Sequence, residues 1–88
     1  MNEPQSALEF PCRFPIKAMG LAADDFDLLV VAIISRHVPQ LGEGAVNTRP
    51  SSNGKYLSVT VTIEARNQQQ LDAIYRDLTD HQRVVWAL

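Results

Sequence analysis

Residues 49–64 read Arg49-Pro50-Ser51-Ser52-Asn53-Gly54-Lys55-Tyr56-Leu57-Ser58-Val59-Thr60-Val61-Thr62-Ile63-Glu64, and they say more about the architecture than any other segment. Asn53-Gly54 is the strongest short-range signal for a β-hairpin, because a two-residue type I′ turn needs positive φ at both central positions. After the turn, apolar and polar residues alternate, with Leu57, Val59, Val61 and Ile63 on one side and Ser58, Thr60, Thr62 and Glu64 on the other. This alternation predicts an antiparallel sheet with one buried face and one face in water.

A turn at this point also sets the register of the two strands that it joins. The expected pairs are Ser52 with Lys55, Ser51 with Tyr56, Arg49 with Ser58, and Asn47 with Thr60. The first of these strands spans about residues 46–50, and its inward side is expected to hold Val46, Thr48 and Pro50. Because proline has no N–H to donate to a neighbouring strand, Pro50 predicts that this strand lies at an edge of the sheet.

Two further strands are expected, one on each side of the hairpin in the sequence. Residues 10–19 alternate with Phe14, Ile16 and Ala18 inward, and Gly20 is expected to end this strand. Pro15 should have its missing N–H facing away from a neighbour or lying at a bulge. Residues 84–88 are nearly all apolar and predict a final strand, with Trp86 in the core and Val85 and Ala87 on the other side.

Two helices are predicted between the strands. The first begins at Asp24 or Asp25, where helix capping explains the acidic cluster Asp24, Asp25 and Asp27 more simply than a cation site does. Its buried stripe is expected to be Phe26, Leu29, Val30, Ile33, Ile34 and His37, and Pro39 stops it. Asn67 caps the second helix, with Gln70 at the reciprocal position of a capping box. Its buried stripe is expected to be Leu71, Ile74, Tyr75 and Leu78.

The resulting order is βαββαβ, which predicts an α+β fold of the ferredoxin-like sandwich type. Right-handed crossovers in two split β-α-β units give a four-stranded antiparallel sheet in the order 4-1-3-2, with both helices on one face. We expect a flexible tail over residues 1–9 and a single domain over residues 10–88.

The composition of the chain argues against several classes of protein. The chain has 88 residues, of which 45% are hydrophobic and 20% charged, and its formal net charge is -2. An acidic balance argues against a dedicated nucleic-acid-binding protein. Cys12 is the only cysteine, so no intrachain disulfide can form, which suits a reducing compartment. No apolar run approaches the ~18 residues that span a bilayer, so we expect a cytoplasmic protein without membrane contact.

The chemistries that this fold commonly hosts lack their residues here. RNA-recognition domains need aromatic residues on the open sheet face, where this sequence has Arg13, Lys17, Ser58, Thr60 and Thr62, with only Tyr56 at the margin. The loop 19–23 has neither the cysteine pair of a metal chaperone nor the phosphate-binding arginine of a small phosphatase. His37 is expected to be packed near a helix end and His81 to be exposed in a turn. We therefore expect no enzymatic activity, metal or cofactor.

Two surface features remain. Arg49 and Lys55 flank the hydroxyls of Ser51 and Ser52 and could hold a phosphate or carboxylate, although turn chemistry alone also accounts for these residues. The two sheet edges, with Val85 and Ala87, favour association, either as a homodimer or with another protein.

Five segments of the chain together resemble the small bacterial YbeD-like family. They are 8–11 (Leu-Glu-Phe-Pro), 14–20 (Phe-Pro-Ile-Lys-Ala-Met-Gly), 35–39 (Ser-Arg-His-Val-Pro), 49–59 with its Pro-Ser-Ser-x-Gly-x-Tyr hairpin, and 84–88 (Val-Val-Trp-Ala-Leu). The resemblance implies the same βαββαβ fold in a cytoplasmic protein. It also implies similarity to ACT-type regulatory domains, which bind small ligands at dimer interfaces near the loop after the first strand. Members have been called lipoate regulatory proteins because of an association with lipoate metabolism, and none has established site residues.

The residues and the resemblance together predict a non-enzymatic regulatory or protein-interaction module, linked to lipoate metabolism. The alternative is a sensor of a small molecule or anion near the Arg49/Lys55 hairpin, and the weaker alternative is an RNA-binding module. The candidate surface for a ligand or partner consists of Lys17, Gly20, Arg49, Ser51, Ser52, Lys55 and Tyr56.

Overall fold

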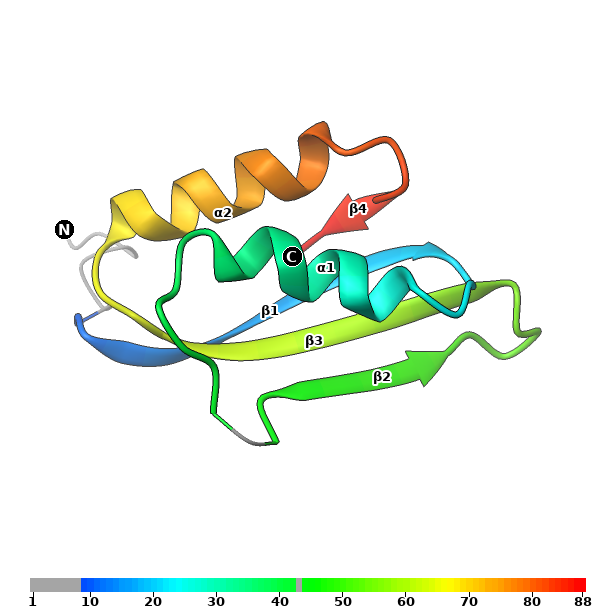
Figure 1. Ribbon diagram of the computed structural model, residues 1–88, viewed down its shortest axis with the longest axis horizontal. Coiled ribbons are helices and arrows are strands. Elements are labelled where there is room, and N and C mark those ends of the chain that lie inside the picture. Colours follow the sequence, from blue (N-terminus) through cyan, green and yellow to red (C-terminus); the bar gives the residue numbers. More distant parts are fainter. Residues whose placement is uncertain (1–8, 43) are drawn as a thin grey trace, which may run out of the picture.

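The computed structural model describes residues 9–42 and 44–88, and six elements follow one another in the predicted order. They are β1 (Cys12–Leu21), α1 (Phe26–Ser35), β2 (Val46–Pro50), β3 (Tyr56–Ala65), α2 (Gln68–Asp80) and β4 (Trp86–Ala87). The strands form one antiparallel sheet in the order β2-β3-β1-β4, as predicted, and α1 and α2 lie side by side on one face of it (Figure 1). Of the tail expected over residues 1–9, residues 1–8 lie outside the described part of the chain.

The core lies between the sheet and the two helices. The alternation in β3 is confirmed, because Val59, Val61 and Ile63 are buried while Ser58, Thr60 and Thr62 are half-exposed on the other face. The helices and β1 contribute the largest remaining buried side chains: Ile16, Phe26, Val30, Ile33, Ile34, Leu71, Ile74 and Leu78. Among the described residues, no layer covers the other face of the sheet, and that face carries Lys17 and Arg49.

The hairpin has the predicted register but a different turn. Arg49 pairs with Ser58 and Asn47 with Thr60, as expected, and the Ser51 N–H donates to the Tyr56 carbonyl over 2.8 Å. Gly54 has a φ of 75°, whereas no non-glycine residue of the described chain has a positive φ, so Asn53 does not adopt a type I′ conformation. Instead, the Gly54 N–H donates to the Ser51 carbonyl, and the Asn53 side chain accepts from the Lys55 N–H. The asparagine therefore stabilises the loop through its side chain.

Strand β2 is an edge strand, as Pro50 predicts, but its inward side is not buried. Val46 is half-buried, whereas Thr48 and Pro50 are exposed. The helices pack on β1, β3 and β4, and β2 extends beyond them (Figure 1). An edge strand with no helix above it has no layer against which to bury side chains.

Strand β1 runs on through Gly20 to Leu21, two residues past its predicted end. Lys17 exchanges backbone hydrogen bonds with Leu88, and the Met19 carbonyl accepts from the Val85 N–H, so odd-numbered residues of β1 face β4. The backbone nitrogen of Pro15 also faces the β4 side of the strand, but Pro15 lies beyond the last hydrogen bond between β1 and the C-terminal segment. Its missing N–H therefore removes no hydrogen bond from the sheet, as predicted.

The helix ends differ in detail from the prediction. Asn67 caps α2, since its Oδ1 accepts from the Gln70 N–H over 2.8 Å. The Gln70 Oε1 accepts from the Arg66 N–H, one residue before the capping-box donor. At α1, Asp25 occupies the N-cap position, but its side chain makes no capping hydrogen bond, so capping does not account for this carboxylate. Helix α1 ends at Ser35, before Arg36 and His37.

Candidate functional site

Trp86 lies on the open face of the sheet, so the prediction that it belongs to the core is wrong. Strand β4 is only two residues long, and it pairs Ala87 with Ala18 and Trp86 with Met19. Because Ala18 is fully buried beneath the helices, Ala87 faces the core beside it and Trp86 must face the other way. The apolar run 84–88 did not show which residues face inward; only the register with β1 decides it.

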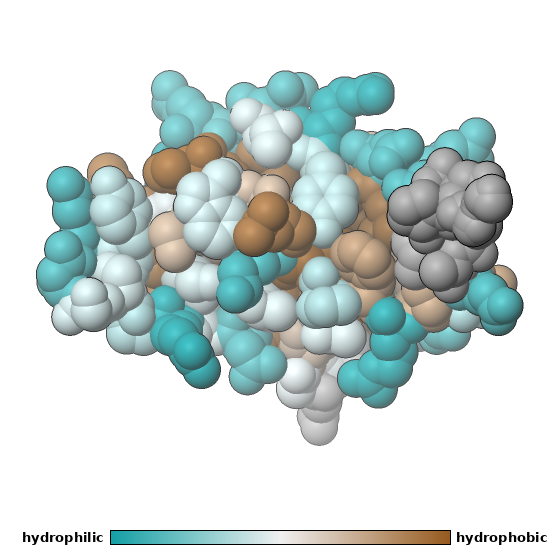
Figure 2. All heavy atoms as spheres, turned by 180° about the vertical axis from the view of Figure 1, so that it is seen from behind, coloured by the Kyte–Doolittle hydropathy of each residue, from teal (hydrophilic) through white to brown (hydrophobic). Residues whose placement is uncertain are grey.

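The open face is basic although the chain is acidic. Strands β1 and β2 place Arg13, Lys17 and Arg49 on it, whereas Glu64 is its only acidic strand residue among those described. The other described carboxylates near the sheet lie in or beside the helical layer: Asp24, Asp25, Asp27, Asp72, Asp77 and Asp80. Figure 2 shows the molecule from behind, where apolar and weakly polar side chains across the middle are interrupted by hydrophilic ones, and further hydrophilic side chains lie toward the margins.

Two shallow hollows on this face share Lys17, Arg49 and Ser58. One, of about 320 Å³, is also lined by Asn47, Thr48 and Thr60. The other, of about 260 Å³, is also lined by Met19, Pro50, Ser51 and Trp86. We call the two together the Lys17–Arg49 cleft. It has a polar half over β2 and β3 and an apolar half against Trp86. The pairing of Arg49 with Ser58 and of Met19 with both Ser58 and Trp86 brings four strands to this point.

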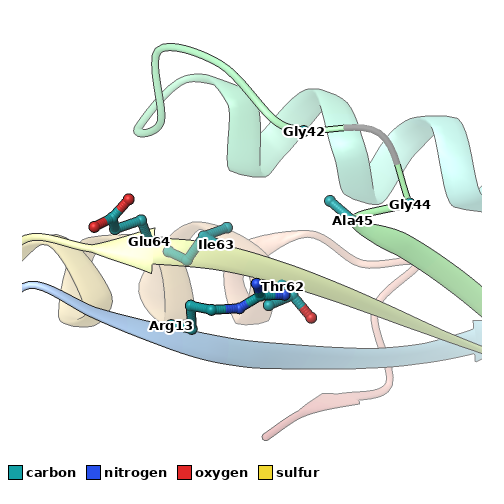
Figure 3. Close-up of a pocket in the computed structure, with 7 residues that line it drawn as sticks. All are labelled: Arg13, Gly42, Gly44, Ala45, Thr62, Ile63 and Glu64. Atoms are coloured by element: carbon teal, nitrogen blue, oxygen red, sulfur yellow. The ribbon is translucent and has the colours of Figure 1, made fainter.

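A third hollow lies further along the same sheet, where β3 ends. It has a volume of about 310 Å³ and is lined by Arg13, Gly42, Gly44, Ala45, Thr62, Ile63 and Glu64. Figure 3 shows the Arg13 side chain extending beside Thr62, while Glu64 points away from it. The Ala45 carbonyl accepts from the Thr62 N–H, which ties the loop before β2 to this strand.

The structure gathers only part of the predicted candidate surface in one place. Lys17, Arg49 and Ser51 line the cleft, whereas Ser52 and Lys55 are exposed at the hairpin tip and do not. The Lys55 Nζ lies 5.5 Å from the centroid of the Tyr56 ring, a cation–π distance. Arg49 therefore lines the same hollows as Lys17, and Lys55 does not line them. The predicted candidate surface did not include Ser58, Thr60 or Trp86, which the sheet register brings beside Lys17 and Arg49.

Ser51 and Gly20, two residues of the predicted candidate surface, have structural roles within the fold. The Ser51 hydroxyl oxygen accepts from the Tyr56 N–H, and its proton is donated to the Asn53 Oδ1, each over 3.0 Å. Gly20 is buried beneath α1. A Cβ at this position would lie 2.4 Å from the Arg83 carbonyl oxygen and 2.5 Å from the Phe26 ring. Glycine is thus needed at position 20 for packing rather than for contact with a ligand.

Arg83 and Asp25 form an ion pair at the end of the molecule that holds the loop after β1. The Arg83 Nη2 donates to the Asp25 Oδ1 over 2.8 Å, and this hydrogen bond lowers the pKa of the Asp25 carboxyl and raises that of the guanidinium. An apolar cavity of about 410 Å³ lies here, lined by Leu21, Ala23, Gln82, Arg83 and Val85. Its one cation among the described residues is already paired, so this cavity is poorly suited to an anion.

The two histidines have structural partners. The His37 Nε2 lies 2.7 Å from the Asp77 Oδ2, and the His37 carbonyl accepts from the Gln70 Nε2, so this residue joins the end of α1 to α2. His81 follows α2, half-buried rather than exposed as predicted, and its Nδ1 accepts from the Arg83 N–H. No group of three His, Cys, Asp or Glu residues within 9–42 and 44–88 could hold a metal ion.

Comparison with known proteins places the chain in one family. The model of a family described as "Protein of unknown function (DUF493)" matches residues 5–88. The chain belongs to the DUF493 family. A UPF0250 protein of Janthinobacterium sp. is 43% identical over 88 residues, which cover 100% of this chain and 97% of that protein. A UPF0250 protein of Chromobacterium violaceum is 44% identical over 87 residues, covering 99% and 98%. The predicted resemblance to YbeD-like proteins is confirmed.

A solved structure shares the fold of this DUF493 protein. The solution structure of protein HP0495 from H. pylori has a TM-score of 0.69, covering 100% of this chain and 97% of that one, at 17% sequence identity. Such a low identity shows the fold alone, which confirms the predicted α+β class. The family is uncharacterised, and the names of these relatives indicate no enzymatic activity. In the described part of the chain, neither helix has the length and apolar character needed to cross a bilayer.

Proposed function

We propose that this DUF493 protein is a non-enzymatic regulatory module that binds another protein through the open face of its sheet. The observation that carries this proposal is the position of Trp86, a large aromatic residue half-exposed on that face beside Lys17 and Arg49. Tryptophan and arginine are the residues most enriched among those that dominate protein–protein binding energies. The resemblance to ACT-type regulatory domains supports a regulatory role.

The shape of the cleft favours a protein partner over a free small molecule. Ligand pockets are concave, with volumes of roughly 300–1,000 Å³, and they bury most of the ligand surface. The two halves of the cleft have volumes of about 260 and 320 Å³, and Lys17, Asn47, Thr48, Arg49 and Pro50 along them are exposed. Such shallow hollows fit one or two side chains of a larger partner, whose remaining surface lies against the sheet around them.

Binding from a native bacterial extract tests the proposal. Crosslinked and purified complexes of the wild type should contain a protein that is lost from Arg49→Glu and from Trp86→Ala. The matched control is Arg76→Glu, which reverses an exposed charge on the outer side of α2. If every variant recovers the same proteins, or if none recovers any, the open face is not the partner-binding surface. Circular dichroism spectra of the variants should match the wild type.

The second candidate function is a sensor of a small anion, and the cation pair of Lys17 and Arg49 supports it. Thermal-shift screening with phosphates, amino acids and lipoyl compounds should then find a stabilising compound whose effect Arg49→Ala removes. The sensor would differ from the predicted one in using Lys17, rather than Lys55, beside Arg49.

We further propose that the protein acts in the cytoplasm, in or near lipoate metabolism, as the resemblance implies. Deletion of its gene should then change the level of protein lipoylation, which an antibody against lipoyl-lysine measures. Homodimerisation stays a prediction, and the exposed Val85 is its best candidate contact. Sedimentation that shows a monomer at tens of micromolar would count against it.

A further inference from the structure

We infer that the Lys17–Arg49 cleft recognises an acidic segment of the partner protein, with a carboxylate between the two cations and an apolar side chain on Trp86. This inference rests on the proposed function, since it names the chemistry that the open face binds. It requires three properties of the cleft: cations without an internal partner, hydrogen-bond donors beside them, and an apolar wall within reach.

Lys17 and Arg49 form no ion pair with any described residue, so both can bind an external carboxylate. All ion pairs within residues 9–42 and 44–88 involve Asp25 or Asp77, which lie on the helical side of the molecule, and none includes Lys17 or Arg49. Holding two like charges beside the same hollow is unfavourable unless an anion lies between them. Arginine also presents a planar pair of donors that matches the two oxygens of a carboxylate.

Neutral donors lie next to the cations on the same face. Ser58 belongs to both halves of the cleft, and Thr60 and Asn47 line the polar half. The side chains of these three residues form no hydrogen bond with any other described residue. They can therefore donate to the second oxygen of a bound carboxylate or to the backbone of the segment that carries it.

The apolar half determines what accompanies the carboxylate. Trp86, Met19 and Pro50 line it, and Lys17 and Arg49 also border it. A carboxylate held by these cations therefore has an apolar surface on one side, where a neighbouring leucine or phenylalanine of the segment would be sheltered from water. A fully hydrated inorganic anion would leave this surface exposed.

Charge complementarity favours an acidic protein over a nucleic acid. The sheet face is basic, while the helical layer carries most of the described carboxylates and would repel a phosphate backbone that wraps around the molecule. The central positions where RNA-recognition domains stack bases hold Lys17, Ser58 and Thr60 here. Trp86 provides one aromatic surface at the edge of the sheet, which suits one side chain better than a row of bases.

Trp86 is the only tryptophan of the chain, so its fluorescence reports on the cleft directly. The probe is an acetylated and amidated eight-residue peptide of alternating glutamate and leucine, and its twin has glutamine in place of every glutamate. The acidic peptide should shift the Trp86 emission in a saturable way below ~1 mM, and added salt should weaken its binding. Arg49→Gln and Lys17→Gln should each weaken binding roughly tenfold or more, and Arg76→Gln should leave it unchanged.

Several results would overturn the inference. Equal binding of the glutamine twin would show that the cleft does not recognise carboxylates. If neither peptide changes the emission at ~1 mM, the cleft is not a binding site for such a segment. An equal, Arg49-dependent shift with inorganic phosphate or glutamate alone would identify a small-anion sensor instead. A stronger shift with single-stranded RNA would indicate a nucleic-acid surface. Salt-sensitive self-association in sedimentation would identify the acidic helical layer of a second copy as the occupant.

The outcomes separate this inference from the proposed function. If the extract experiment recovers a partner that depends on Arg49 and Trp86 while both peptides fail, the open face binds a protein by another chemistry. If the acidic peptide binds while the extract yields no partner, the cleft recognises carboxylates and the role of a protein-binding module is wrong.

Discussion

At the scale of single residues, several side chains have roles that their type alone does not reveal. Asn53 supports the hairpin through its side chain, and Asp25 at the start of α1 pairs with Arg83 instead of capping the helix. Gly20 leaves room for Phe26 and for the chain that leads into β4. In each case a distant segment, or a local hydrogen bond, decides what the residue does.

Substitution of Gly20 by alanine should destabilise the protein. The new Cβ would lie within 2.6 Å of the Arg83 carbonyl oxygen and the Phe26 ring, so backbone or core must shift. We expect the free energy of unfolding to fall by about 1–3 kcal/mol. Gly42→Ala is the matched control, because no atom of the described residues outside its two chain neighbours lies within 4 Å of its added Cβ. Urea denaturation measures both, and an equal effect of the two substitutions would contradict the packing role of Gly20.

The Asp25–Arg83 ion pair should stabilise the protein only above a certain pH. The guanidinium lowers the pKa of the Asp25 carboxyl below its ordinary value of 3.8. A lowered folded-state pKa means that the pair contributes fully above pH 3.8 and that its contribution is lost as the pH falls through the folded-state pKa. The melting temperature of Asp25→Asn should therefore lie slightly below that of the wild type at neutral pH and approach it in acid.

The control for this pH dependence is Asp24→Asn, which removes a charge one residue earlier that has no ion pair among the described residues. Its melting temperature should differ less from that of the wild type at neutral pH. Because the Asp25 pair is exposed, added salt should also reduce the difference between Asp25→Asn and the wild type. A difference of constant size from neutral pH to strong acid would refute the role of the ion pair.

At the scale of elements, the two helices are joined by polar contacts as well as by their apolar stripes. Gln70 is the only buried polar residue within the described ranges, with 7% of its surface exposed. Its Nε2 donates to the His37 carbonyl beyond α1, and its Oε1 accepts from the Arg66 N–H before α2. His37 in turn contacts Asp77 on α2. These bonds fix where the two helices lie relative to each other above the sheet.

Gln70→Glu should destabilise this junction at neutral pH. A carboxylate can still accept from the Arg66 N–H, but it cannot donate to the His37 carbonyl, and its charge is buried. We expect a loss of about 1–3 kcal/mol of unfolding free energy at pH 7, and a smaller loss near pH 4, where a protonated carboxyl can donate again. Gln69→Glu, at an exposed position of the same helix, should have little effect at either pH. Equal losses at both pH values would contradict the donor role of Gln70.

At the scale of the whole molecule, the described residues form two layers of different charge, and one face of the sheet is covered by neither helix. The two helices cover one face of the sheet (Figure 1). The apolar side of β3 lies against these helices, and its polar side forms the floor of the Lys17–Arg49 cleft. Burial of one side is therefore a requirement of the fold, and exposure of the other is a requirement of the proposed function.

Exchanging polar and apolar residues on the two sides of β3 tests this arrangement. Val61→Thr places a hydroxyl at a fully buried position and should cost about 1–3 kcal/mol of unfolding free energy. Thr60→Val changes the open face and should alter stability by no more than about 0.5 kcal/mol. Chemical denaturation of the two single variants measures this. A reversed order of the two effects would mean that the faces of the sheet are assigned the wrong way round.

Local patterns determined the helices, the strands and their order, because periodicity and turn residues act over a few neighbouring positions. Alternation after Gly54 identified β3 and its buried side, because successive side chains of a strand face opposite sides of the sheet. Pro50 identified an edge strand, because proline has no N–H to donate to a neighbouring strand. The tertiary structure alone decided that Trp86 faces outward, because a uniformly apolar run has no internal sign of which side is buried and only pairing with Met19 sets it. It also decided that Lys17 joins Arg49 in one cleft. Those residues belong to different strands, and their distance depends on a sheet that is complete only when the whole chain has folded.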